Sequence, residues 1–259
     1  MIDIHCHILP GMDDGPETME ESLHMVRAFM ADGISEVVAT PHGPIYGERS
    51  IMPSDIQQAC FDLQRSLLEA GLDFMIHPGQ EILLDEHTPR LLQSDRLVTL
   101  AGSDYALVEA PLFCPLPDLN DILFELRLMG YRPILAHFER AVYAAEDLSL
   151  IRKLSEEEAL FQINADSLLG LHGSVAKRLA WKMLEMGTVD FVSSDAHGLT
   201  NRKSHLHQVH ALLKRKVGSE LAERLVLVNP HKVLLNQPIE REDGMGEMGA
   251  KRRRRFWTK

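Results

Sequence analysis

Histidines and carboxylates that end apolar runs are the residues of this sequence with the clearest chemical meaning. A His-x-His pair follows the run Ile2–Ile4, His42 ends VVATPH and His137 ends PILAH. Glu81 ends MIHPGQE, Glu109 follows YALV, and an Asp-x-His pair ends VDFVSSDAH. Imidazole and carboxylate together suit Mn, Fe or Zn, and a carboxylate can bridge two cations. The pattern therefore predicts a site that holds more than one divalent cation.

The spacing inside the two pairs fits this chemistry, because residues i and i+2 of an extended strand face the same side. His5 and His7 can therefore meet one cation, and so can Asp195 and His197. One histidine taken alone is more often a buried, hydrogen-bonded residue than a ligand. The signal comes from the joint placement of these residues, at one strand end after another.

Alternating strands and helices must position these residues. Strands are predicted at 2–4, 37–39, 74–76, 106–108, 133–136, 161–163 and 189–192. Between them, Met19, Leu23, Val26 and Met30 have helical spacing, and further helices are predicted at 56–68, 119–126, 175–186 and 229–235. Repeated β-α units of this kind predict a mainly parallel sheet, closed or nearly closed into a TIM-like barrel. An open doubly wound sheet is the alternative, but no GxGxxG follows the first strand. In a barrel, all these ligand candidates share the rim at the C-terminal ends of the strands.

Composition limits the classes of function. The 259 residues carry a net charge of -11, and the tail 241–259 has seven Lys/Arg against three Asp/Glu, so residues 1–240 hold about -15. A body this acidic would repel a phosphate backbone, which argues against a nucleic-acid partner. No apolar run is long enough for a membrane span, and no secretory signal is seen. The three cysteines form no CxxC, which fits a reducing cytoplasm. The KRRRRFWTK end predicts a disordered basic tail, which could make weak contact with a membrane surface.

At these motifs the chain resembles the polymerase and histidinol phosphatase (PHP) superfamily, and within it the bacterial tyrosine phosphatases of capsule and exopolysaccharide synthesis. The resemblance rests on DIHCHILPGMDDGP at 3–16, ATPH at 39–42, GQE at 79–81, VEAP at 108–111, AHFER at 136–140 and SSDAH at 193–197. It implies one PHP-type domain over residues 1–240 and a single distorted (β/α)7 barrel. It also implies a centre of two to three divalent cations, with Mn expected first and Fe, Co or Zn as alternatives. The implied partner is a phosphotyrosine protein, such as a bacterial tyrosine kinase that controls capsule synthesis.

The resemblance also assigns roles to individual residues. One cation would take His5, His7, Glu81 and Asp195; a second would share Glu81 and add Glu109 and His137; a third would take Asp14, His42 and His197. Spacing does not decide between Asp13 and Asp14, and the resemblance favours Asp14. Arg140 and Arg202 match arginines that lie beside the phosphate in this family.

The implied reaction is hydrolysis of phosphate monoesters, in which bound cations lower the pKa of water and so supply a nucleophile near neutral pH. A cysteine-dependent phosphatase is excluded, because no cysteine is followed by an arginine at the Cys-x5-Arg spacing. Three alternatives stay open: hydrolysis of histidinol phosphate or another small phosphomonoester, a PHP exonuclease, and a metal-binding regulator without catalysis.

Overall fold

Eight short strands, all paired in parallel, run through the part of the chain that the structure describes. The structure is a computed structural model, and it describes residues 1–43 and 51–241. The strands are β1 (Ile2–Cys6), β2 (Glu36–Ala39), β3 (Met75–Pro78), β4 (Glu81–Leu83), β5 (Tyr105–Glu109), β6 (Arg132–Leu135), β7 (Leu160–Asn164) and β8 (Phe191–Ser193). They form two parallel sheets, in the orders β1-β2-β3 and β4-β5-β6-β7-β8. The expected α/β class with parallel strands is therefore confirmed.

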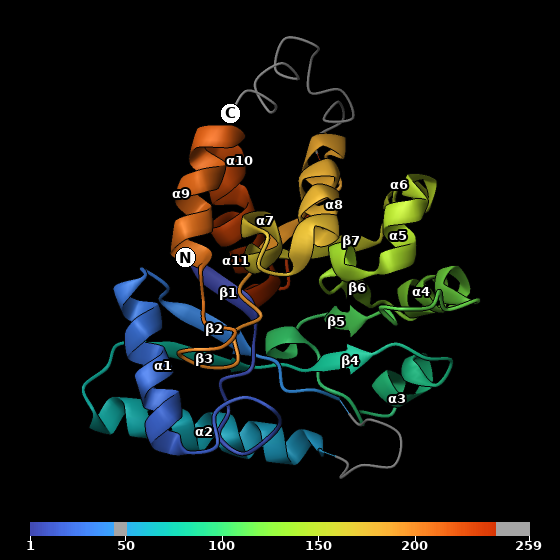
Figure 1. Ribbon diagram of the computed structural model, residues 1–259. Helices are drawn as coiled ribbons and strands as arrows, with labels where there is room; N and C mark the ends of the chain where they lie inside the picture. The colour runs from blue at the N-terminus through green and yellow to red at the C-terminus, as the bar shows by residue number, and fades with distance from the viewer. Residues whose placement is uncertain (44–50, 242–259) are drawn as a thin grey trace.

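Helices surround these sheets (Figure 1). The longer ones are α1 (Met19–Ala31), α2 (Pro53–Glu69), α4 (Leu119–Leu128), α6 (Leu148–Glu156), α8 (Gly173–Met186) and α9 (Leu206–Lys216). The short ones are α3 (Thr88–Gln93), α5 (Val142–Glu146), α7 (Ala165–Leu169), α10 (Ser219–Glu223) and α11 (Asn229–Leu234), with a π-helical turn at Arg224–Val228. Within the described residues, no helix is both long and apolar enough to cross a bilayer.

Short backbone contacts link the two sheets at both seams. At one seam, the amide of Gly43 donates to the carbonyl of Glu81 at 2.7 Å, and the amide of Glu81 donates to Pro41 at 3.1 Å. At the other seam, the amide of His7 donates to the carbonyl of Ala196 at 2.9 Å. These contacts are isolated bridges and not continuous ladders, so the structure gives two linked parallel sheets and does not by itself define a closed barrel.

Gly79 lies where the chain leaves β3 for β4. A Cβ at this position would lie only 2.6 Å from Cγ1 of Val38 and 3.0 Å from Cδ2 of Leu100. The absence of a side chain thus lets the chain pass close to β2, after which β4 pairs with β5. This crossing brings Glu81 to the same rim as the ends of β1 and β2.

The helix α1 shows how sequence defines an element and where periodicity misleads. It begins with a capping box, in which the Thr18 hydroxyl accepts from the amide of Glu21 and the Glu21 carboxylate accepts from the amide of Thr18. The predicted face of Met19, Leu23, Val26 and Met30 is only partly correct. Val26 is buried, but the other fully buried apolar residues are Met25 and Phe29. The core-facing side is therefore turned relative to the predicted one.

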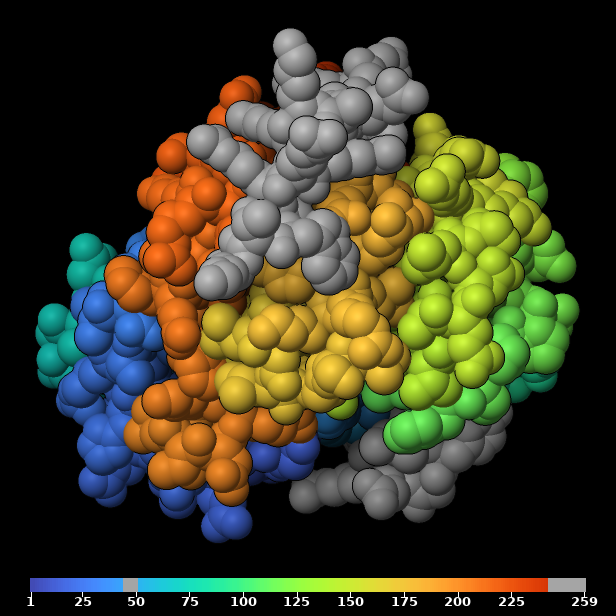
Figure 2. Space-filling view, turned by 45° about the horizontal axis from the view of Figure 1, so that its top comes forward, coloured from blue at the N-terminus to red at the C-terminus, as the bar shows by residue number. Residues whose placement is uncertain are grey.

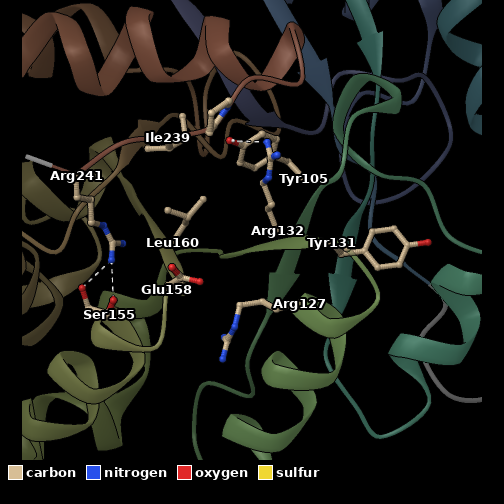
Figure 3. Close-up of a pocket in the computed structure, with 11 residues that line it drawn as sticks. Tyr105, Arg127, Tyr131, Arg132, Ser155, Glu158, Leu160, Ile239 and Arg241 are labelled. Carbon is tan, nitrogen blue, oxygen red and sulfur yellow. Dashed lines mark hydrogen bonds between the residues drawn. The ribbon is translucent and has the colours of Figure 1, made fainter.

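The folded domain includes Arg241, the first residue of the predicted tail. Its guanidinium donates to the carboxylate of Asp190 and to the carbonyl of Ala159 at 2.8 Å. It also donates to Ser155 Oγ at 2.9 Å (Figure 3). Asp190 is almost fully buried and also accepts from the amide of Phe161. Arg241 thus ties the end of the domain to α6, β7 and the start of β8, whereas 242–259 lie outside the described residues.

The contacts of Arg241 predict a loss of stability in Arg241→Ala. The change leaves the buried carboxylate of Asp190 without its counter-charge, so we expect the free energy of unfolding to fall by about 2–3 kcal/mol. Urea unfolding measures this. Arg127→Ala is the matched control, because Arg127 lines the same hollow but pairs with no carboxylate among the described residues. A control variant destabilised as much as Arg241→Ala would refute the role given to the ion pair.

The hollow in Figure 3 has a volume of about 510 Å³ and contains Tyr105, Arg132 and Leu160, the first residues of β5, β6 and β7. The predicted site residues lie at the opposite, C-terminal ends of the strands. This hollow is therefore separate from the candidate site.

Candidate metal centre

The predicted ligands converge at the C-terminal ends of the strands. In Figure 2 a hollow opens on this face, at the lower centre, between the segments that follow β5 (green), β7 (yellow) and β8 (orange). Nine side chains come together in four overlapping groups, and within each group the possible ligand atoms lie within 4.8 Å of one another. The groups are His7, Asp14, His42 and His197; His5, His7 and Glu81; His5, His137 and Asp195; and Glu81, Glu109 and His137.

Three of the imidazoles are held by one ring nitrogen, which leaves the other nitrogen free for a cation. His5 Nδ1 lies 3.0 Å from Gln162 Oε1, and His7 Nδ1 lies 2.6 Å from Asp13 Oδ2. The Nε2 atoms of these two histidines then face each other at 3.4 Å. His197 is fixed in the same way, with its Nδ1 3.0 Å from the carbonyl oxygen of Asp195. Fixing one ring nitrogen sets the tautomer and the orientation of a metal-binding histidine.

Glu81 lies at the centre of the cluster and is 1% exposed. Its Oε1 lies 2.7 Å from His137 Nε2, and its Oε2 lies 3.0 Å from His42 Nδ1. Glu81 is therefore placed between two of the groups, as a bridging carboxylate would be.

The donor set fits divalent cations. Glu81 Oε2, His137 Nδ1 and His197 Nε2 are buried but make no hydrogen bond, although buried polar atoms nearly always have a partner. The rings of His7 and His197 stack with centroids 3.7 Å apart, so two imidazoles are packed face to face beside carboxylates. Such crowding of hard and intermediate ligand atoms is the chemistry that a cation stabilises.

The pKa values of the side chains in the cluster shift in different directions, because burial and the neighbouring charges act differently on each group. Burial alone would raise the pKa of Glu81, but the charge of His5 and close contacts with His137 and His42 hold it well below its usual value. Burial and the charge of Glu81 raise the pKa of Glu109. Burial, with the charge of His7, lowers the pKa of His197 to about 3, which keeps this ring neutral and able to bind a cation.

His7 has the opposite tendency. Burial would lower its pKa, but the hydrogen bond with Asp13, the contact with Glu81 and the charges of both carboxylates together outweigh burial and raise the pKa to about 10. A cation that binds His7 must therefore displace a proton, so binding at this residue is coupled to pH.

The two adjacent aspartates differ in position. Asp14 Oδ1 lies 3.1 Å from His197 Nε2 and 3.3 Å from His42 Nε2, within the first of the four groups. Asp13 is instead turned inward, where it also accepts from the amides of Gly15 and His42. Asp13 thus orients His7, and Asp14 faces the cluster.

Both predicted arginines reach this cluster, Arg140 from the 3-10 turn Phe138–Arg140 and Arg202 from the segment after β8. Arg140 Nη1 lies 3.3 Å from Asp195 Oδ2, while Arg202 Nη2 lies 3.0 Å from Asp195 Oδ1 and its Nη1 lies 3.1 Å from Asp14 Oδ2. The backbone is strained here, because His137, Asp195 and Arg202 have φ values of 32°, 53° and 53°. Strain of this kind in residues other than glycine is concentrated at functional sites.

The strand-end pattern missed the residues that support the cluster. Gln162 Oε1 accepts from the amide of His137 as well as contacting His5, and Asn164 Nδ2 donates to Asp195 Oδ2 at 2.6 Å. Both lie on β7, two residues apart, so they share a face of that strand. The FQIN sequence could have suggested them, since buried polar residues at i and i+2 near a strand end point to the same rim.

Other residues lie outside the cluster. His77, which precedes Glu81 by four residues, pairs with Glu36 at 3.0 Å. Cys6 is fully buried in the core and points away from His5 and His7, with Sγ 3.7 Å from the carbonyl oxygen of Val38. Burial raises the pKa of this thiol well above its usual value. A cysteine nucleophile at this position is therefore excluded.

The fold and the cluster define a parallel α/β protein with a candidate site for divalent cations. The profile of the family described as capsular polysaccharide synthesis, CpsB/CapC, matches residues 1–235. The chain belongs to this family.

Named relatives agree with this assignment. The tyrosine-protein phosphatase YwqE of Bacillus subtilis is 36% identical over 245 residues, which cover 93% of this chain and 94% of the relative. The putative tyrosine-protein phosphatase CapC of Staphylococcus aureus is 32% identical, with 93% and 94% covered. A solved structure from work on YwqE from Bacillus subtilis and CpsB from Streptococcus pneumoniae, described as unique metal-dependent tyrosine phosphatases, superposes with a TM-score of 0.90. It is 35% identical and covers 93% of this chain and 97% of its own.

Proposed function

We propose that this protein is a metal-dependent tyrosine-protein phosphatase. The observation that carries the proposal is the convergence of nine His, Asp and Glu side chains into groups whose ligand atoms lie within 4.8 Å, with two arginines beside them. The substrate class comes from the relatives, which are named as tyrosine-protein phosphatases and match nearly the whole chain.

We assign three cations to the cluster. The first would be held by His5, His7, Glu81 and Asp195; the second by Glu81, Glu109 and His137; the third by Asp14, His42 and His197. Mn is the cation we expect, with Fe, Co or Zn as substitutes, because mixed imidazole and carboxylate sites suit these metals. We also interpret the two sheets as one distorted (β/α)7 barrel, in which β3 and β4 are a single strand interrupted at Gly79.

The chain's own residues orient the substrate. Bound cations supply Lewis acidity and lower the pKa of water. The guanidinium groups of Arg140 and Arg202 flank Asp195, where they can hold the outer oxygens of a phosphate and balance its charge. A tyrosinate leaves comparatively easily, because the phenol has a pKa of about 10, so a strong general acid is less needed than for an alkyl phosphate.

Arg140→Ala and Arg202→Ala test this role. We expect each to lower kcat/KM on a phosphotyrosine peptide by at least about tenfold, since a lost charge-assisted contact costs roughly 1.5–3 kcal/mol. The metal content should remain that of the parent protein, because neither arginine belongs to a ligand group. Elemental analysis beside the rate measurement checks both points. Loss of metal, or parental rates, would show that these residues do not clamp phosphate.

The substrate class is tested by comparing a phosphotyrosine peptide with histidinol phosphate under the same Mn concentration. We expect the peptide to be hydrolysed with the higher kcat/KM. Faster turnover of histidinol phosphate would replace the proposal with a small-molecule phosphatase. Absence of turnover on both would favour a regulator that binds metal without catalysis.

The physiological partner that we propose is a bacterial tyrosine kinase of capsule or exopolysaccharide synthesis, met in the cytoplasm. The family assignment to capsular polysaccharide synthesis supports this. Weak attachment to a membrane through 242–259 is a separate hypothesis, and those residues lie outside the described part of the chain.

A further inference from the structure

A groove with an apolar floor and a basic rim lies between α7, α8 and α9, outside the metal centre. Its volume is about 350 Å³, and α8 and α9 flank α7 (Figure 1). The floor is made by Leu168, Trp181 and Leu212. The rim is made by four exposed cations, Lys177, Arg178, Lys182 and Lys216. We call these seven residues the basic groove.

The charge of the basic groove is the reverse of the charge of the whole chain. The chain carries -11, yet the lining of this groove contains one acid, Glu185, against its four cations. Glu185 neutralises only Lys182, at 3.2 Å. Arg178 and Lys216 form no ion pair with any residue in 1–43 or 51–241, so both charges are available to a ligand.

The floor of the basic groove is fixed to the candidate metal centre. Trp181 Nε1 donates to the carbonyl of Leu168, which holds the indole against the end of α7. The same short helix begins after Asn164, whose side chain donates to Asp195. His205 Nδ1 also contacts Asp166 Oδ1 at 2.7 Å, which joins α7 to the start of α9. Leu168 lies four positions after Asn164, a rise of about 6 Å along a helix.

We propose that the basic groove is a docking site for an acidic segment of the phosphotyrosine protein, with one apolar side chain of that segment seated in its hollow. The proposal rests on the proposed phosphatase function, because it concerns the substrate of the same site. An extended peptide advances about 3.3 Å per residue, so the rise of about 6 Å between Asn164 and Leu168 already corresponds to about two residues, and the docking segment lies at least that far from the phosphotyrosine. A hollow of this size accepts a single side chain, whereas a membrane surface is met by protruding apolar groups, which favours a peptide as the occupant.

Binding is measured first without catalysis. The probe is a tyrosine peptide without phosphate that carries one Leu and several Glu three to six residues from the tyrosine on each side. The control peptide has the same sequence with Gln in place of each Glu. Trp181 fluorescence reports binding in full-length protein carrying Trp257→Phe, since these are the two tryptophans of the chain. We expect saturable binding of the acidic peptide, at least about tenfold tighter than the Gln peptide, and weaker at high salt.

Charge reversal then locates the site. Arg178→Glu with Lys216→Glu should weaken binding of the acidic peptide by about tenfold or more. The same two variants should lower kcat/KM on the phosphorylated acidic peptide and leave para-nitrophenyl phosphate turnover unchanged. The matched control is Arg152→Glu with Lys153→Glu, two exposed cations on α6, which should keep parental binding.

The outcomes separate docking from catalysis. Turnover of phosphotyrosine peptides without a fluorescence change, or equal loss in the α6 control, would overturn the docking site and leave the phosphatase function standing. Binding that follows the charge of the groove, in a protein that hydrolyses no phosphotyrosine, would keep the acidic-peptide site and remove the phosphatase. If vesicles of phosphatidylcholine and phosphatidylserine change Trp181 fluorescence and displace the peptide, the groove contacts a membrane, and the peptide-docking proposal is overturned.

Discussion

Glu81→Gln is expected to lose bound metal and at least about a thousandfold of phosphatase activity, roughly 4 kcal/mol of transition-state stabilisation. The change keeps the size of the side chain but removes the charge at the centre of the cluster. Glu81 belongs to two of the four ligand groups and contacts both His137 and His42. A neutral amide cannot bridge two cations as a carboxylate does. Loss at this one position should therefore weaken more than one cation site.

The matched control is Glu139→Gln, at another carboxylate that is 1% exposed. Glu139 Oε1 accepts from the amide of Asn164 and from Ser167 Oγ, and a glutamine keeps an oxygen for both contacts. Glu139 belongs to none of the ligand groups, so this variant should retain its metal. Elemental analysis and rates on a phosphotyrosine peptide are measured for both variants. A Glu81→Gln protein with parental metal content would remove Glu81 as the bridge.

Much of the candidate site could be predicted from the sequence, because histidine, aspartate and glutamate are recognised as possible metal ligands by residue type alone. Histidines and carboxylates stand out where a strand should end in apolar residues, and parallel strands can bring such ends together. His5, His42 and His137 were found in this way, although they are far apart along the chain. The geometry now groups them, while their role as ligands remains a prediction.

The supporting residues were harder to find, because a buried amide looks the same in the sequence whether it serves a site or the core. Gln162 and Asn164 act through contacts with His5, His137 and Asp195 that depend on the packing of β7 beside its neighbours. For the same reason, the sequence could not decide whether Asp13 or Asp14 faces the cluster. Two adjacent carboxylates can exchange roles with a small turn of the backbone, which spacing does not reveal.

The secondary structure was also predicted only in part from the sequence. The predicted strands are all present, with ends shifted by one or two residues, but β4 was missed because its three residues follow β3 after only Gly79 and Gln80. The short helices α3, α5 and α7 were missed because one or two turns carry too little periodicity to be recognised. These segments are held by tertiary contacts, as when Asp166 of α7 meets His205.

Removing the divalent cations is expected to abolish activity, and Mn, Co or Fe should restore it better than Mg. Mg prefers an octahedral shell of oxygen atoms and keeps several waters, whereas five imidazoles belong to the ligand groups here. Dialysis against chelator, followed by rates on a phosphotyrosine peptide after each cation is added, measures the order. Full activity in excess chelator after long incubation would contradict the proposed chemistry.

A second readout of metal removal does not depend on catalysis. Without cations, the buried carboxylates Glu81 and Asp195 have, among residues 1–43 and 51–241, only imidazoles and arginines as counter-charges. A ligand that binds only the folded state stabilises it by RT ln(1 + [L]/Kd), which is about 2.7 kcal/mol when the cation is at a hundred times its Kd. The melting temperature should therefore rise when Mn is restored to the metal-free protein. In Glu81→Gln this rise should be smaller, because the same cations have lost their shared ligand, whereas in Glu139→Gln it should equal that of the parent protein.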